Sequence, residues 1–234
     1  MDGEPSGVDV DIARRARDYL GDGFARVSAF ADALAAEGVL RGLIGPRELP
    51  RLWERHLLNS AALLPYLPSA GTVIDVGSGA GLPGVVIACA RPDLHVVLVE
   101  PMERRALWLT DISASLGLAS VEVVQRRAEE LHGRLSADVV TARAVAPMDR
   151  LLTWCFPLVG NSGALLAMKG SRAQEEAAHA GSLIERLGGG PAEVLSAETI
   201  PGVAPTTVVR VLRVRPATQV PAKPARAAKR AKRR

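Results

Sequence analysis

Alternating glycines between two acidic residues have the spacing best suited to chemistry in this sequence. Asp75 lies in an apolar, β-branched run, and Gly77, Gly79 and Gly81 follow it at every second position. A strand, a glycine-rich turn and an apolar helix in this order form a cradle for a nucleotide cofactor, because residues without a Cβ let the ligand approach the backbone closely. Glu100, which ends the next apolar run, is placed to accept hydrogen bonds from ribose hydroxyls.

Two cofactors fit this loop, in two registers. Residues 79–84 match G-x-G-x-x-G, the pattern of dinucleotide-binding loops. Residues 75–81 match D-x-G-x-G-x-G, which suits S-adenosylmethionine. That molecule has no pyrophosphate but carries an ammonium and a sulfonium, so the carboxylate of Asp75 would attract it and would repel a pyrophosphate. The sequence therefore favours S-adenosylmethionine, and a nicotinamide dinucleotide is the alternative.

The elements that must position this loop follow from the hydrophobic pattern. From residue 71 onward, short β-branched runs alternate with stretches of helical length. Strands are expected at 72–77, 95–100, 121–125, 137–145, 163–169, 191–200 and 206–214, and helices at 83–90, 102–116, 147–158 and 171–187. This alternation predicts a doubly wound, mostly parallel seven-stranded α/β sheet of Rossmann-like type. The last two strands have no helix between them, which predicts a hairpin with an antiparallel final strand.

The first 70 residues have a different, helical pattern. Periodic apolar residues predict helices at 9–20 and 24–37, and a third helix whose apolar face runs from Trp53 to Leu64. The expected division is an N-terminal helical extension at 1–70, an α/β domain carrying the cofactor loop at 71–215, and a disordered basic tail at 216–234.

Charge is divided unevenly along the chain. The 234 residues carry 29 Lys and Arg against 25 Asp and Glu, a formal net charge of +4. Residues 216–234 hold seven of the basic residues and no acidic one, which leaves 22 basic against 25 acidic residues elsewhere. The body is therefore mildly acidic, and the sequence pI of about 9.5 belongs to the tail. Such a tail cannot bury a core but can attract phosphate.

Other features exclude several classes of protein. A composition of 48% hydrophobic and 23% charged residues excludes a mainly disordered chain. Cys89 and Cys155 are far apart and the four His follow no metal-ligand spacing, so we expect buried thiols, a reducing compartment and no metal. The acidic N-terminus is unlike a secretory signal, and Pro and Gly interrupt the apolar stretch 61–90. A cytoplasmic protein without a membrane span is expected.

Four motifs together resemble a known enzyme family. They are Arg-His-Leu-Leu-Asn-Ser at 55–60, Asp-Val-Gly-Ser-Gly-Ala-Gly-Leu-Pro-Gly at 75–84, Ala-Arg-Ala at 142–144 and Leu-Ala-Met-Lys-Gly at 166–170. The combination is similar to the bacterial small-subunit ribosomal RNA guanine-N7 methyltransferases, formerly called glucose-inhibited division protein B, over residues 24–214. The resemblance implies a class I S-adenosylmethionine-dependent methyltransferase fold, with 71–215 as the methyltransferase domain. The family's usual Trp-Asn…Asn-Leu-Thr signature before the Arg-His motif is absent here.

The resemblance also implies residue roles. The implied cofactor-binding residues are Asp75, Gly77, Gly79, Gly81, Leu82, Glu100, Ala128, Glu129 and Arg143. Those implied on the target side, where catalysis occurs, are Arg143, Lys169 and His56. Ala128 and Glu129 match the pair near the adenine of the donor, and Arg143 matches the arginine that faces both donor and target base.

Guanine N7 already carries a lone pair, so methyl transfer to it needs no general base. The implied task of the residues is to align the reacting atoms and to exclude water. A guanidinium such as that of Arg143 can donate two hydrogen bonds to guanine O6 or to a phosphate. The expected partner is small-subunit ribosomal RNA or the small ribosomal subunit, bound by a monomer.

Alternatives remain open at two levels. The protein could methylate another substrate, or it could be a non-catalytic nucleotide-binding protein that holds RNA. Among single residues, Arg143 could pair at the surface with Asp138 or Glu130. Lys169 could be an ordinary lysine at a strand end, and His56 could pack beneath the sheet edge.

Overall fold

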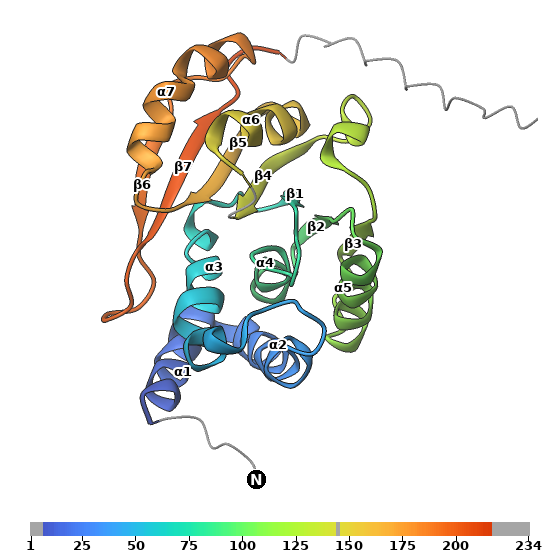
Figure 1. Ribbon diagram of the computed structural model, residues 1–234, viewed down its shortest axis with the longest axis vertical. Coiled ribbons are helices and arrows are strands. Elements are labelled where there is room, and N and C mark those ends of the chain that lie inside the picture. The colour runs from blue at the N-terminus through green and yellow to red at the C-terminus, as the bar shows by residue number, and fades with distance from the viewer. Residues whose placement is uncertain (1–6, 144–145, 217–234) are drawn as a thin grey trace, which may run out of the picture.

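Seven strands form a single sheet in the computed structural model, which describes residues 7–143 and 146–216 (Figure 1). The strands are β1 (Gly71–Val76), β2 (Leu94–Val99), β3 (Val121–Val124), β4 (Ala137–Arg143), β5 (Val159–Lys169), β6 (Glu193–Ala197) and β7 (Thr206–Leu212). Their order across the sheet is β3-β2-β1-β4-β5-β7-β6. Every neighbouring pair is parallel except the two that involve β7. The doubly wound sheet and the antiparallel final strand predicted from the sequence are confirmed.

Helices cover both faces of the sheet. The α-helices are α1 (Gly7–Leu20), α2 (Phe24–Glu37), α3 (Asn59–Ala61), α4 (Gly84–Ala90), α5 (Glu103–Ser115), α6 (Met148–Cys155) and α7 (Ala173–Arg186). Shorter turns of 3₁₀ or π type are η1 (Gly21–Gly23), η2 (Pro46–Arg51), η3 (Leu52–Leu58), η4 (Leu64–Tyr66), η5 (Ala128–Leu131) and η6 (Phe156–Leu158). In Figure 1, α2, α4 and α5 lie on one side of the sheet, and α6 and α7 lie on the other.

Alternate strand residues divide the interior into two hydrophobic cores. Val73 belongs to the core that contains residues of α2, α4 and α5, whereas its neighbour Ile74 belongs to the core formed with α6 and α7. Both residues are fully buried. The strands are therefore apolar on both faces, as in a parallel sheet covered by helices. Asp75, the next residue, faces the α4 side because strand side chains alternate.

The third predicted helix has an unexpected winding. One regular α-helix was expected through Trp53 and Leu57, but the segment is a 3₁₀ turn (η2), a π-helix (η3) and one α-helical turn (α3). Both residues are buried as predicted. Pro50 has no N–H to donate, which prevents regular α-helical bonding at the entry to η3. Single π-helical turns occur often at functional sites, and this one carries Arg55 and His56.

The sheet changes direction between β1 and β4. From β1 the chain builds outward to β2 and β3, and from β4 it builds the other way to β5. Register places Asp75 beside Thr141, two residues before Arg143. Open α/β sheets bind ligands at the carboxyl ends of strands beside such a switch point. The topology therefore brings the ends of β1, β4 and β5 to one binding edge.

The N-terminal helices share one continuous hydrophobic core with the sheet. The division of the chain at residues 70 and 215 stays a prediction. The tail expected to be disordered lies, beyond residue 216, outside the described residues. No helix of the described residues is long and apolar enough to cross a membrane.

Candidate functional site

The glycine-rich loop, residues 77–83, leaves the carboxyl end of β1 and leads into α4. Gly77, Gly79 and Gly81 have φ angles of +73°, +56° and +104°, in the left-handed region that favours glycine. A Cβ at Gly81 would also lie 2.6 Å from Cγ2 of Val85. The fold of the loop itself therefore requires these glycines, in addition to the close ligand approach expected from the sequence.

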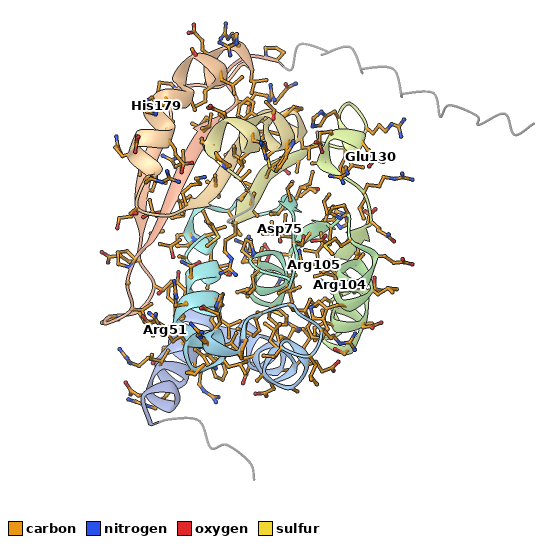
Figure 2. All side chains as sticks on the ribbon, viewed as in Figure 1. Arg51, Asp75, Arg104, Arg105, Glu130 and His179 are labelled. Carbon is orange, nitrogen blue, oxygen red and sulfur yellow. The ribbon has the colours of Figure 1, made fainter. Side chains whose placement is uncertain are left out.

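The side chain of Asp75, labelled in Figure 2, extends from β1 to the start of α4. The residue is 1% exposed, and its Oδ2 accepts a hydrogen bond from the backbone N–H of Gly84 at 3.0 Å. Its Oδ1 has no hydrogen-bond partner among the described residues. Burial raises the pKa of this carboxyl to about 7. A buried carboxylate oxygen without a donor is costly, so the position suits a ligand that brings a donor or a cation.

Glu100 ties the loop to the end of β2. The residue is 2% exposed, its Oε2 accepts the N–H of Gly79 at 3.0 Å, and its Oε1 accepts the N–H of Met102 at 2.9 Å. Each carboxylate oxygen has further acceptor capacity. The ribose contact expected of Glu100 therefore stays a prediction that this geometry permits.

Trp108 of α5 is a further loop-supporting residue that the sequence pattern did not identify. Its indole N–H donates to the carbonyl oxygen of Ala80 at 3.0 Å, and the guanidinium of Arg41 lies 5.4 Å from its ring centroid. Periodicity marks Trp108 only as an apolar helix residue, because the hydrogen bond depends on how α5 packs against the loop.

The remaining predicted donor residues lie along the same sheet edge. Leu82 is buried within the loop, and Ala128 and Glu129 begin η5 directly beyond β3. Ala128 is buried and Glu129 is exposed. Because β3 pairs with β2, this pair lies on the side of the loop where Glu100 stands. Contacts of these residues with the adenine stay predictions.

Arg143, at the end of β4, meets the π-helical turn. Its Nη2 lies 3.1 Å from Nδ1 of His56, and its Nη1 lies 3.5 Å from Oδ1 of Asn59 and from the carbonyl oxygen of Arg55. On the far side of the ring, Nε2 of His56 lies 2.8 Å from Oε2 of Glu48. The family resemblance implied that Arg143 and His56 both lie on the target side, and in the structure the two side chains are in contact.

The alternative surface partners of Arg143 are engaged elsewhere. Oδ2 of Asp138 accepts the N–H of Thr72 at 2.8 Å, and Oε1 of Glu130 accepts the N–H of Arg127 at 3.2 Å. Glu48 contacts His56 and Asn59 contacts Arg143, but the sequence analysis did not identify either residue as part of the site. No spacing rule links Glu48 with a strand end almost a hundred residues later in the chain.

Lys169, at the end of β5, holds neighbouring elements together. Its Nζ donates to the carbonyl oxygen of Ala146 at 2.9 Å and lies 2.6 Å from Oε2 of Glu176 in α7. The hydrogen bond from Lys169 lowers the pKa of Glu176, whose Oε2 also accepts the N–H of Met148 at 3.0 Å. The side chain of Lys169 is 8% exposed. The ammonium therefore binds within the protein, and its contact with RNA stays a prediction.

A cavity of about 610 Å³ joins the three predicted target-side residues. His56, Arg143 and Lys169 all line it, together with residues of η2, η3 and the start of α7. Further arginines on its wall are Arg51, Arg55 and Arg172. The site thus has two parts at one edge of the sheet: a cradle, residues 75–84 with Glu100, and the cavity beside it.

The cradle fits S-adenosylmethionine on its own features. Oδ1 of Asp75, which has no partner among residues 7–143 and 146–216, is suited to a ligand with cationic groups, and an ionised Asp75 would repel a pyrophosphate. The described residues contain no group of three or more His, Cys, Asp or Glu side chains arranged as metal ligands would be.

This strand order, with an acid in β1 and a glycine-rich loop directly after it, defines the protein as a class I S-adenosylmethionine-dependent methyltransferase. The fold is similar to that of the S-adenosylmethionine-dependent methyltransferase SibL, with a TM-score of 0.57 and 18% identity over 71% of this chain and 57% of that one. It is also similar to NSun6 from Pyrococcus horikoshii, with a TM-score of 0.52 and 13% identity over 68% and 51% of the two chains. These likenesses concern the fold alone.

Comparison with protein families identifies the family. The model of the family rRNA small subunit methyltransferase G (GidB) matches residues 24–199. The ribosomal RNA small subunit methyltransferase G of Nocardioides sp. is 55% identical over 86% of this chain and 80% of its own length. That of Salinispora tropica is 50% identical over 94% and 95% of the two chains. The chain belongs to the rRNA small subunit methyltransferase G family, which confirms the resemblance found in the motifs.

Proposed function

We propose that this protein transfers a methyl group from S-adenosylmethionine to N7 of one guanine in small-subunit ribosomal RNA. Family membership supports the donor and the RNA. One observation carries the choice of N7: Arg143 offers hydrogen-bond donors to the cavity, while the adjacent His56 is engaged at both ring nitrogens. No proton has to be removed from N7 before it attacks the methyl group. Methylation at N7 therefore suits a cavity in which Arg143 supplies a positioning donor and the neighbouring His56 is not free to act as a base.

The residues of the cradle would hold the donor. Asp75 and Glu100 supply carboxylate oxygens, and the glycines let the ligand approach the loop backbone closely. When bound, S-adenosylmethionine supplies a methyl group activated by its sulfonium. Arg143 donates to O6 of the guanine and so fixes the position of the neighbouring N7. The cavity walls exclude water from the reacting atoms, and catalysis is therefore mostly positioning.

The arginines of the cavity wall supply contacts for the RNA backbone. The side chains of Arg51 and Arg55 are both 51% exposed, and Arg172 is exposed at the start of α7. Guanidinium groups bind phosphate well, and such contacts hold and orient RNA without choosing a base. Base choice then belongs to Arg143, deeper in the cavity.

The protein is proposed to act as a cytoplasmic monomer on ribosomal RNA or on the small subunit. Light scattering of the purified protein measures its molecular mass and so tests whether it is a monomer. Parallel reactions with naked RNA and with assembled subunits identify the substrate, because each offers the same nucleotides in a different shape.

Transfer of a labelled methyl group tests the function. The donor carries a radioactive methyl group, and small-subunit RNA, small subunits and unrelated RNA serve as acceptors. Reduction and aniline treatment then cleave the RNA at N7-methylguanine, which locates the product. Cleavage at one guanine of small-subunit RNA is the expected result. Transfer to another substrate would instead support a different methyltransferase, and donor binding without transfer would support a non-catalytic RNA-binding protein.

A further inference from the structure

A chain of hydrogen bonds runs from the surface of the protein to the target side of the cavity. Glu48 of η2 contacts Nε2 of His56 at 2.8 Å, and Nδ1 of His56 contacts Nη2 of Arg143 at 3.1 Å. The three residues come from a 3₁₀ turn, a π-helix and a strand end, so only the folded protein aligns them.

The chemistry of the two ends fixes the proton on the middle residue. A guanidinium only donates hydrogen bonds, so Nδ1 of His56 must be the acceptor of the bond from Arg143. A carboxylate only accepts, so Nε2 of His56 carries the proton that it donates to Glu48. The hydrogen bond from His56 lowers the pKa of Glu48, in agreement with an ionised acceptor. His56 is thus a neutral imidazole in one defined tautomer.

We propose that Glu48 and His56 are positioning residues that hold the Arg143 guanidinium against the target guanine. The proposal rests on the proposed function and adds how the arginine is oriented. Each Nη nitrogen carries two N–H groups and the contact with His56 uses one of them, so Arg143 keeps donors for the acceptor edge of the base. His56 acts through Arg143 and has no proton-transfer step of its own.

The arrangement works only while Nδ1 of His56 is unprotonated. A second proton would turn this nitrogen into a donor and would place an imidazolium against a guanidinium. The charged groups that face the ring are Glu48, Arg143 and Arg55, whose Nη1 lies 3.7 Å from Oε1 of Glu48. Burial lowers the pKa of His56 below its usual 6.5, so the neutral form persists at neutral pH. At saturating S-adenosylmethionine, where protonation of Asp75 no longer limits donor binding, kcat should therefore decline in acid, below pH 6.5, as His56 gains a proton.

Two substitutions of His56 separate its two contacts. The side-chain oxygen of asparagine lies where Nδ1 was, so His56→Asn keeps an acceptor for Arg143 that does not titrate. The side-chain amide of glutamine lies where Nε2 was, so His56→Gln keeps a donor for Glu48 and loses the acceptor. We expect His56→Gln to lower kcat on the order of 100-fold, the cost of a misplaced positioning group. His56→Asn should retain most of kcat and should lose the acid decline that His56 causes.

Matched variants of the acids complete the test. Glu48→Ala removes the outer acceptor and should lower kcat with the S-adenosylmethionine Kd unchanged, whereas Glu48→Gln, which still offers an oxygen, should restore most of it. Glu122→Ala is the control: Glu122 of β3 also contacts a histidine, with its Oε2 3.5 Å from Nε2 of His95 in β2, but neither residue lines the cavity. Equal losses in His56→Asn and His56→Gln, or a loss in Glu122→Ala as large as in Glu48→Ala, would overturn the proposal. Melting temperatures separate these effects from misfolding.

A measurement independent of activity reads the tautomer directly. A long-range ¹H–¹⁵N spectrum of the histidine rings, with His56 assigned by its loss in His56→Asn, should show a proton on Nε2 and none on Nδ1 at pH 7.5. A proton on Nδ1 at that pH would overturn the proposal. A wild-type protein that methylates no guanine in small-subunit RNA would overturn the proposed function, and the spectrum would then still decide whether the hydrogen-bonded chain exists.

Discussion

Asp75 is buried beside the backbone N–H of Gly84 and has no donor at Oδ1 within the part of the chain that the structure describes, and these two features determine how it titrates. Its pKa in the folded protein, about 7, is far above the 3.8 of an exposed aspartate. The folded state therefore binds the proton more tightly than the unfolded state does. The stabilising contribution of this group is complete below pH 3.8 and is lost as the pH rises through 7.

Asp75→Asn should remove this pH dependence from the ligand-free protein. The asparagine oxygen can still accept the N–H of Gly84, and the side chain has no proton to lose. Between pH 5 and pH 7 the wild type should lose up to about 1.4 kcal/mol of stability per pH unit relative to the variant. Urea unfolding of both proteins at pH 5, 6 and 7 measures the difference. A difference that stays constant with pH would show that Asp75 titrates normally.

Binding of S-adenosylmethionine should depend on the charge of the same residue. The cationic ligand favours the carboxylate, so the wild-type affinity should rise as the pH increases, by up to about tenfold per unit below the pKa. Asp75→Asn should bind more weakly at pH 8 and should show little pH dependence. Calorimetric titration from pH 5.5 to pH 8 checks both. Parallel pH profiles in the two proteins would mean that Asp75 does not face the cationic groups.

At the scale of elements, a buried arginine connects the far end of β7 to its neighbours. Arg213 is 5% exposed and donates to the carbonyl oxygens of Val159 at 2.8 Å, Phe156 at 2.6 Å and Leu187 at 3.2 Å. Its guanidinium carbon lies 4.5 Å from the ring centroid of Phe156. Phe156, Val159 and Leu187 are the C-cap residues of α6, η6 and α7, so the positive charge also meets the negative ends of three helical segments.

Arg213→Met should destabilise the protein without affecting the site. Loss of the guanidinium leaves three carbonyls without this donor, and we expect a cost of about 3 kcal/mol in the free energy of unfolding. Arg210→Met is the matched control, because Arg210 lies on the same sheet but forms a partly exposed ion pair with Glu193 at 2.5 Å. Its loss should cost below about 1 kcal/mol. Urea unfolding measures both, and an unchanged S-adenosylmethionine Kd confirms that the effect is confined to stability.

Elements with a regular local pattern could be predicted, and those shaped by distant contacts could not. β1 and the helix that follows its loop were expected within a residue or so, because burial on both faces leaves a continuous apolar run. β5 begins at Val159, before the expected 163, because the turn-like run Gly-Asn-Ser-Gly at 160–163 lies inside the strand. Ser162 there has a φ of +61°, and the register with β4 shifts nearby. Such a bulge depends on the neighbouring strand.

The same distinction applies to the candidate site. The carboxyl ends of parallel strands share an edge whatever their sequence, so Asp75, Glu100 and Arg143 could be placed at one edge from the pattern alone. Their hydrogen-bond partners could not be predicted. Glu48 of η2 contacts His56 across the entry to the π-helix, and the ammonium of Lys169 contacts Glu176 where α7 packs at the end of β5, and both contacts depend on how these elements pack. The pattern of residue types along the sequence located the site, whereas the packing of the elements determines which atoms form hydrogen bonds there.

At the scale of the whole molecule, the uneven division of charge leads us to propose that the affinity for RNA and the choice of base depend on different parts of the chain. The 215 residues before the tail carry three more acidic than basic residues, and the tail carries seven basic residues and no acidic one. A cradle proposed to hold a cationic donor through Asp75 and Glu100 would gain from a mildly acidic body. The arginines of the cavity wall would then supply a few local contacts for RNA, and the proposed role of the tail is non-specific attraction to phosphate.

Removal of residues 216–234 should weaken RNA binding and reduce its dependence on salt. Each phosphate contact that is lost lowers the slope of log K against log salt by about 0.7 to 0.9, so seven basic residues could lower it by up to about 6. Filter binding from 50 to 300 mM salt measures the slope. A full-length variant with the seven basic residues changed to glutamine is the control, and it should behave like the truncated protein because charge, not length, produces the effect. Both proteins should methylate the same guanine as the wild type, since the residues proposed to choose the base lie in the cavity. Methylation of a different guanine after truncation would place base choice in the tail and would overturn this division of roles.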